Sequence, residues 1–198
     1  MDNLTRIINS LGKRIFEEVS LRQVSIDAKM PYTTTHRTIS ANKGLFSIKA
    51  ISNIKLCSLN KEDDITKHYL IISERKKQAE FLNKKPEYKL LTRDLPAGRF
   101  SAVLFGSRAS DKSRDKSDID ICILSADGKR NANFSSAEII LGLEINPIFM
   151  SAAEFSGMLK KNGQNLAKEI ITNHVILYGE EYFWEVVWNA VRQKTVQE

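Results

Sequence analysis

Several features that would mark a secreted, membrane-bound or zinc-dependent protein are scarce in this chain. Two cysteines, Cys57 and Cys122, are too few for a disulfide framework or a thiolate zinc site. The three histidines, His36, His68 and His174, lie in different segments without metal-ligand spacing. No run approaches the roughly 18 apolar residues of a membrane span, and charges interrupt the first fourteen positions, where a signal peptide would be apolar. We therefore expect a cytoplasmic protein without a membrane segment.

The positive charge is concentrated at one end of the chain. The net charge is +6, and residues 1–60 carry nine Lys or Arg against four Asp or Glu, which leaves +1 for the other 138 residues. Such an excess favours a polyanion as partner of the N-terminal third. A soluble basic surface explains it equally well.

The pattern of residues changes twice along the 198 positions, and this favours two small domains. Residues 1–60 show three short helical patterns and a hairpin, and residues 61–98 form a helical linker. Residues 99–198 alternate strands and helices, so the fold class is α+β. The linker's apolar stripe is expected to pack on one domain or on a second copy of the chain, and comprises Ile65, Tyr69, Ile72, Ala79 and Leu82.

The N-terminal third resembles a winged helix-turn-helix domain. Apolar residues recur at helical spacing from Leu4 to Leu11, Ser20 is placed to cap a second helix, and a Thr-rich third helix precedes two strands, 46–51 and 54–59. The resemblance implies binding of duplex DNA, with the third helix in the major groove. The groove contacts would be Thr33, Thr34, Thr35, His36 and Arg37, and the phosphate contacts Lys43, Lys49 and Lys55. Winged helices also serve as dimerisation or protein-docking modules, and a Thr-rich helix start can be capping alone.

The segment at 101–124 carries the chemical signal. An apolar strand runs into Gly106 and Ser107, and a second strand alternates Asp118 and Asp120 with isoleucines. Period-two alternation places both carboxylates on one face, with Cα atoms about 6.6 Å apart, where they can converge on one cation. Oxygen ligands suit Mg²⁺ or Mn²⁺. The Gly-Ser turn offers backbone N–H groups and a hydroxyl to a phosphate.

This segment resembles the polymerase-beta-like nucleotidyltransferases, above all the minimal ones. Their pattern is Gly-Ser, ten residues, then Asp-x-Asp, and Gly106-Ser107 and Asp118-Ile119-Asp120 match it. The resemblance, over about residues 99–180, implies transfer of a nucleoside monophosphate from an NTP, with ATP the expected donor, by two Mg²⁺ ions. It also implies a third carboxylate, from a later strand, that joins Asp118 and Asp120 as a catalytic ligand of the metal that activates the acceptor. Glu144, before Pro147, is the candidate for this ligand. The alternative is a solvent-facing glutamate on an edge strand.

Basic residues near the motif are further candidates for phosphate contacts. Arg108 adjoins the Gly-Ser turn, whereas Lys112, Arg114 and Lys116 lie between the two halves of the motif and would grip triphosphate or acceptor, or simply be solvated. Further along, Ser151 and Glu154 form a capping box, and residues 165–179 read as a helix and then a strand. The closing aromatic helix is expected to be core, although Trp184 and Trp188 could dock a partner.

These observations lead to one main hypothesis and one alternative. The main hypothesis is a Mg²⁺-dependent nucleotidyltransferase fused to a DNA-binding domain. The alternative is a DNA-binding regulator whose transferase-like domain senses nucleotide without catalysis. The resemblance to minimal nucleotidyltransferases adds a toxin-like protein as a candidate acceptor, and a second copy of the chain is a further candidate partner.

Overall fold

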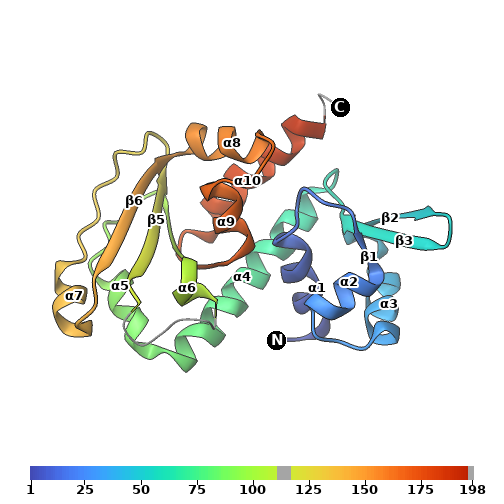
Figure 1. The fold of residues 1–198 in the computed structure, drawn as a ribbon, viewed down its shortest axis with the longest axis horizontal. Coiled ribbons are helices and arrows are strands. Elements are labelled where there is room, and N and C mark those ends of the chain that lie inside the picture. The colour runs from blue at the N-terminus through green and yellow to red at the C-terminus, as the bar shows by residue number, and fades with distance from the viewer. Residues whose placement is uncertain (111–116, 196–198) are drawn as a thin grey trace. The chain divides into compact units, whose positions relative to one another are not determined.

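A computed structural model describes residues 1–110 and 117–195 of the chain, which divides into two compact units, Met1–Lys76 and Lys77–Glu198 (Figure 1). Both units combine helices with a sheet, so the predicted α+β class is confirmed. Among the described residues, we find no helix with the length and apolarity that crossing a membrane would need.

The first unit consists of three helices and a small antiparallel sheet with strand order β1-β3-β2. The predicted helices and hairpin are confirmed, whereas β1 is too short to show alternation in the sequence. The elements are α1 (Asn3–Gly12), β1 (Val19–Ser20), α2 (Leu21–Asp27), α3 (Tyr32–Ala41), the 3₁₀ turn η1 (Lys43–Leu45), β2 (Phe46–Ile51) and β3 (Ile54–Leu59).

Local interactions explain where these elements begin and turn. The Asp2 carboxylate accepts the Thr5 N–H at 2.9 Å and caps α1. The Ser20 hydroxyl accepts the Gln23 N–H at 3.1 Å, as its predicted capping role requires. The hairpin turns at Ser52, whose φ is +53°, and a two-residue turn of this kind matches the twist of the flanking strands.

Helix α4 (Asp64–Lys84) spans the division between the units, so the predicted linker 61–98 is shared between them. The predicted apolar stripe is confirmed only in part: Leu82 packs against the core of the second unit, whereas Ile65 and Ile72 are 51% and 48% exposed. The buried face of the helix includes Thr66, Leu70 and Ser73. The reason is polar packing, because the Ser73 hydroxyl donates to Asn9 Oδ1 at 2.8 Å inside the first unit. Hydrophobic periodicity does not detect a buried face on which Thr66 and Ser73 accompany a single leucine, Leu70.

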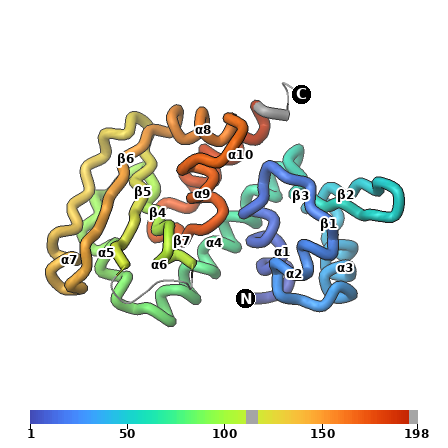
Figure 2. Tube along the Cα trace, in the orientation of Figure 1, coloured from blue at the N-terminus to red at the C-terminus, as the bar shows by residue number. Residues whose placement is uncertain are grey.

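The second unit is built on a four-stranded mixed sheet with strand order β6-β5-β4-β7 (Figure 2). Strand β5 runs antiparallel to β4 and parallel to β6, which forms an edge as Pro147 predicted. The elements are η2 (Pro86–Lys89), α5 (Leu90–Arg93), β4 (Ser101–Phe105), α6 (Gly106–Ala109), β5 (Ile119–Ser125), α7 (Ser135–Leu141), β6 (Ile145–Ser151), α8 (Ala152–Lys160), α9 (Leu166–Thr172), β7 (His174–Tyr178) and α10 (Glu180–Thr195).

Helices cover both faces of this sheet. On one face, the isoleucines of β5 pack in a core with Tyr88 of η2, Leu91 of α5 and Phe134, which precedes α7. Helices α8, α9 and α10 gather on one side of the sheet (Figure 1), where Phe183, Trp184 and Trp188 are fully buried. The aromatic helix is therefore core, as expected, and the two tryptophans are not available to dock a partner. A four-stranded mixed sheet flanked by helices fits the predicted nucleotidyltransferase fold.

Candidate functional site

The antiparallel pairing of β4 and β5 brings the two halves of the sequence motif together. Phe105, the last residue of β4, pairs with Asp120, so Gly106 follows directly beside the start of β5. The backbone of Gly106 has a φ of +69°, and a Cβ built there would lie 2.5 Å from Asp120 Oδ2. Glycine is required at this position both by its left-handed conformation and by the approach of the carboxylate. The Gly-Ser turn and Asp120 are thus in direct contact.

The two aspartates of the motif occupy different environments. Asp118 precedes β5 and is exposed, whereas Asp120 lies within the strand and is half-buried. Burial raises the pKa of the Asp120 carboxyl, and the negative charges of Asp118 and Glu169 raise it further. Charge of one sign therefore accumulates at this end of the sheet. A cation placed between these carboxylates would relieve both the repulsion and the desolvation.

Glu169 was not predicted from the sequence. It lies in α9 and is exposed, and its charge acts on Asp120 across the fold. In the sequence it is one glutamate in an ordinary amphipathic helix, with no motif to distinguish it. Only the packing of α9 on the face of the sheet that carries Asp120 reveals its position.

Glu144 lies next to the aspartate motif along the backbone. Its carbonyl accepts the Ile119 N–H at 2.9 Å, and the parallel register then sets Asn146 beside Asp120. The Glu144 side chain is exposed and precedes β6. Among residues 1–110 and 117–195, no three His, Cys, Asp or Glu side chains come together as a metal-binding group. An amide, that of Asn146, occupies the register position beside Asp120, and the role of Glu144 as a metal ligand stays a prediction.

The chemistry of the two aspartates fits a divalent ion. Asp118 and Asp120 supply carboxylate oxygens, which Mg²⁺ and Mn²⁺ prefer, and their mutual repulsion is the electrostatic condition that such an ion satisfies. Because Gly106 contacts Asp120, an ion bound to this carboxylate would lie close to the backbone of the Gly-Ser turn.

Ser107 and Arg108 occupy the first turn of α6, but they face different surroundings. Ser107 is half-buried, and its carbonyl accepts the Ser110 hydroxyl at 3.1 Å. Arg108 is only 9% exposed, and its Nε donates to the Ser117 carbonyl at 2.9 Å. Helix α6 has four residues, so its dipole is small, and phosphate binding here would depend on backbone N–H groups. Contacts of Ser107 and Arg108 with a nucleotide remain predictions. Lys112, Arg114 and Lys116 lie outside the described residues.

The predicted DNA-contacting residues divide into exposed and buried ones. Thr33, Arg37 and Lys43 are exposed and Thr34 is half-buried. Thr35 is fully buried, and its hydroxyl donates to the Pro31 carbonyl at 3.1 Å. The prediction that Thr35 reaches DNA is therefore wrong, because its side chain faces the interior of the first unit.

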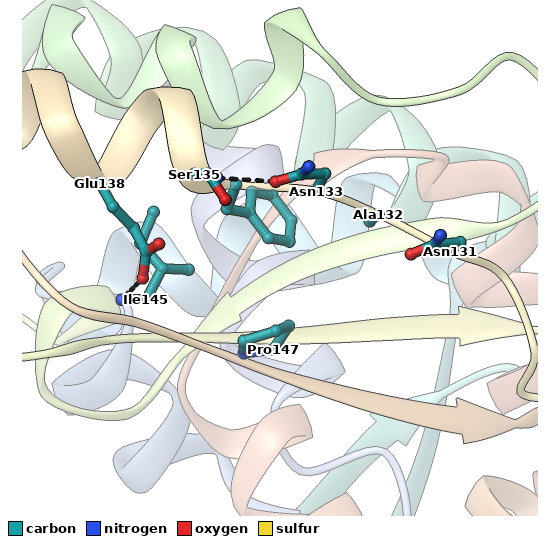
Figure 3. A pocket seen from close by; sticks show the side chains of 8 residues that line it. Asn131, Ala132, Asn133, Ser135, Glu138, Ile145 and Pro147 are labelled. Carbon is teal, nitrogen blue, oxygen red and sulfur yellow. Dashed lines mark hydrogen bonds between the residues drawn. The ribbon is translucent and has the colours of Figure 1, made fainter.

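A separate pocket of about 260 Å³ lies on the face of β6 opposite to the one that carries Asn146 and adjoins Asp120 (Figure 3). Ile145 and Pro147, which line it, alternate along the strand with Asn146, so the pocket does not open on the side of Asp120. Two hydrogen bonds cross its wall: Glu138 Oε1 accepts the Ile145 N–H at 3.0 Å, and Asn133 Oδ1 accepts the Ser135 N–H at 2.9 Å.

Comparison with known proteins agrees with the motif. Residues 100–182 match the family described as Polymerase beta, Nucleotidyltransferase. This span begins with the residue before β4 and contains the Gly-Ser turn, both aspartates and Glu144, and it supports placing the second unit in the nucleotidyltransferase superfamily. The match does not extend to the first unit. No curated protein and no solved structure matches the chain.

Proposed function

We propose that the second unit is a nucleotidyltransferase that moves a nucleoside monophosphate from an NTP, expected to be ATP, to an acceptor hydroxyl. The observation that carries the proposal is the contact between Gly106 and Asp120 inside the span that matches the family. It joins the turn that is proposed to bind phosphate to a carboxylate that is proposed to bind the metal. Phosphoryl chemistry needs little more from a protein than positioning and neutralisation of charge.

In this proposal Asp118 and Asp120 hold the divalent ion, Mg²⁺ or Mn²⁺. When bound, the ion would neutralise charge on the triphosphate and lower the pKa of the acceptor hydroxyl. Backbone N–H groups at Gly106 and Ser107, with the Ser107 hydroxyl, orient the triphosphate for attack on its α-phosphorus. Glu144, at the neighbouring strand start, is proposed to take the acceptor proton. Pyrophosphate then leaves.

The test is transfer of label from α-labelled NTPs in the presence of Mg²⁺. The acceptors would be the protein itself, RNA and a co-expressed partner protein, including a toxin-like one. We expect label on one acceptor with wild type and none with the Asp118→Ala, Asp120→Ala double variant, while Glu144→Gln slows transfer. Equal labelling by wild type and the double variant on every acceptor would remove the proposal.

We further propose that the first unit is a winged helix that binds duplex DNA. Support comes from the order of its elements, with α3 before the β2–β3 hairpin, and from its +5 charge. Thr33 and Arg37 are one helical turn apart on the exposed side of α3, with Lys43 just beyond the helix. Gel shifts at two salt concentrations test this: Arg37→Ala should weaken binding and Lys43→Ala should reduce its salt dependence. Failure to bind DNA even at low salt would refute it.

A second candidate function is a DNA-binding regulator whose second unit senses nucleotide. The observation favouring it is that the parallel register sets the amide of Asn146, and not a carboxylate, beside Asp120, while Glu144 is exposed. Calorimetry separates the candidates, because nucleotide binding that changes DNA affinity without release of pyrophosphate supports the regulator. Release of pyrophosphate supports the transferase.

A further inference from the structure

Arg108 does not extend into solvent beside the Gly-Ser turn. It is the third residue of α6 and is 9% exposed, which is unusual for a charged side chain. Its guanidinium bonds the Ser117 carbonyl through both Nε, at 2.9 Å, and Nη2. A buried cation on a carbonyl oxygen is a charge-assisted contact and stronger than a neutral hydrogen bond.

The carbonyl that Arg108 holds belongs to the residue immediately before Asp118. The contact therefore ties the Gly-Ser turn to the start of β5, nine residues further along the chain. Tyr88 from η2 lies beside the same guanidinium: burial raises the pKa of the Tyr88 hydroxyl, and the charge of Arg108 opposes this rise. Arg108 is thus enclosed by packed side chains, and its planar fork fixes the direction of the backbone that enters the aspartate motif.

We propose that Arg108 is a positioning residue: it anchors the backbone at Ser117 so that the Asp118 carboxylate is held beside Asp120 for a divalent ion. This proposal rests on the proposed function of the same site. It differs from the role the sequence suggested, in which Arg108 contacts the triphosphate directly. Supporting residues of this kind typically change metal affinity by about 10- to 100-fold when they are removed.

The two roles make different predictions for metal and nucleotide binding. A positioning residue affects the affinity for the ion even when nucleotide is absent. A phosphate contact affects the affinity for nucleotide even when the ion is absent. Both affinities can be measured on the full chain by calorimetry, with Mn²⁺ alone and with ATP in EDTA.

The variants are Arg108→Gln, which removes the cation, and Arg108→Lys, which keeps a single donor and the charge. Arg93→Gln is the matched control, because Arg93 is an exposed arginine of the same unit that forms an ion pair with the neighbouring Asp94. Arg108→Gln should weaken Mn²⁺ binding about 10-fold or more, Arg108→Lys should weaken it less, and Arg93→Gln should bind as wild type does. Metal-free ATP binding should stay within about twofold of wild type in all three.

Thermal unfolding shows whether each variant is folded. If Arg108→Gln is not folded, the Mn²⁺ affinity of Arg108→Lys is the measurement that tests the positioning role. Unchanged Mn²⁺ affinity in the folded Arg108 variants, with weakened metal-free ATP binding, would overturn the positioning role. If wild type itself binds no Mn²⁺, the proposed function fails together with this inference. If wild type binds Mn²⁺ and the Arg108 variants bind it equally well, only the positioning role of Arg108 fails, and the proposed function stands.

Discussion

At the scale of single residues, the site depends on a close approach that one methyl group would disturb. Gly106 has a positive φ and faces Asp120 Oδ2, whereas Gly142, at the end of α7, has a similar φ of +63° with nothing within 4 Å of a built Cβ. Substituting Gly142 by alanine therefore tests backbone strain alone, whereas substituting Gly106 by alanine tests strain together with the steric contact with Asp120.

We predict that Gly106→Ala and Gly142→Ala each lower the free energy of unfolding by about 1–2 kcal/mol, because alanine is strained in the left-handed region. Only Gly106→Ala should also weaken Mn²⁺ binding, since its methyl group displaces the Asp120 carboxylate. Denaturant unfolding and calorimetry measure the two effects. Equal Mn²⁺ affinity in both variants would show that the Gly106 contact does not shape the ion site.

Asp2 gives a residue-scale prediction that depends on pH. Its hydrogen bonds with Lys76 Nζ, at 2.6 Å, and with the Thr5 N–H lower the pKa of the carboxyl well below its usual range. An acid whose pKa is lower in the folded state stabilises the fold above its unfolded pKa, and this stabilisation disappears as the pH falls toward the folded value.

Asp2→Asn keeps a capping oxygen and removes the charge, so at pH 7 it should reduce the free energy of unfolding by about 0.5–1 kcal/mol, because the ion pair is exposed. The difference from wild type should shrink between about pH 5 and pH 2. Lys76→Gln should show the same loss at neutral pH. A loss of equal size throughout that range would mean that the carboxylate charge contributes nothing.

Residue identity alone could not distinguish inward from outward side chains. Thr35 and Arg108 both belong to motifs in which a polar side chain faces a ligand, yet one is buried against Pro31 and the other on the Ser117 carbonyl. Asp118, Asp120 and Gly106 were identified because their spacing and alternation are local properties. Glu169 was missed because its position depends on tertiary packing.

At the scale of elements, the edge strand β6 is protected against pairing with further strands. The Ile119 N–H bonds the Glu144 carbonyl, so the odd-numbered backbone groups of β6 point away from β5. Along that outer side, Glu138 accepts the Ile145 N–H, Pro147 has no N–H, and Glu154 accepts the Ser151 N–H at 2.8 Å. Few backbone N–H groups on the outer side of β6 therefore remain to pair with another strand.

Glu138→Ala should therefore lower the free energy of unfolding by about 1–2 kcal/mol, because the half-buried Ile145 N–H loses a charged acceptor. Glu138→Gln retains a side-chain oxygen and should lose less. Urea denaturation of the three proteins measures this. Equal stability of the alanine variant and wild type would show that the contact does not hold the start of β6.

Elements with strong local signals were predicted from the sequence, and those defined by distant partners were not. The Ser151–Glu154 capping box, the β2–β3 hairpin and the Pro147 edge strand are confirmed. The buried face of α4 was assigned wrongly because it is lined by Thr66 and Ser73. Glu138 was missed because no sequence pattern shows that its carboxylate accepts the backbone N–H at the start of β6.

At the scale of the whole molecule, the chain combines a basic unit and a unit that carries an acidic site. The +5 of residues 1–60 and the carboxylates near Asp120 lie in different units. We therefore expect that the Asp118→Ala, Asp120→Ala double variant binds duplex DNA as tightly as wild type, measured by gel shift in the absence of nucleotide. DNA affinity that changes in this variant would link the two sites directly.

In the proposed function, Asp118 and Asp120 share a divalent ion next to a triphosphate on the Gly106–Ser107 turn. An anomalous difference map from crystals grown with Mn²⁺ and a non-hydrolysable ATP analogue tests it most directly. We expect a manganese peak bonded to oxygens of both carboxylates, with the triphosphate against the N–H groups of the turn. A peak that touches neither aspartate, or a triphosphate bound elsewhere on the chain, would contradict it.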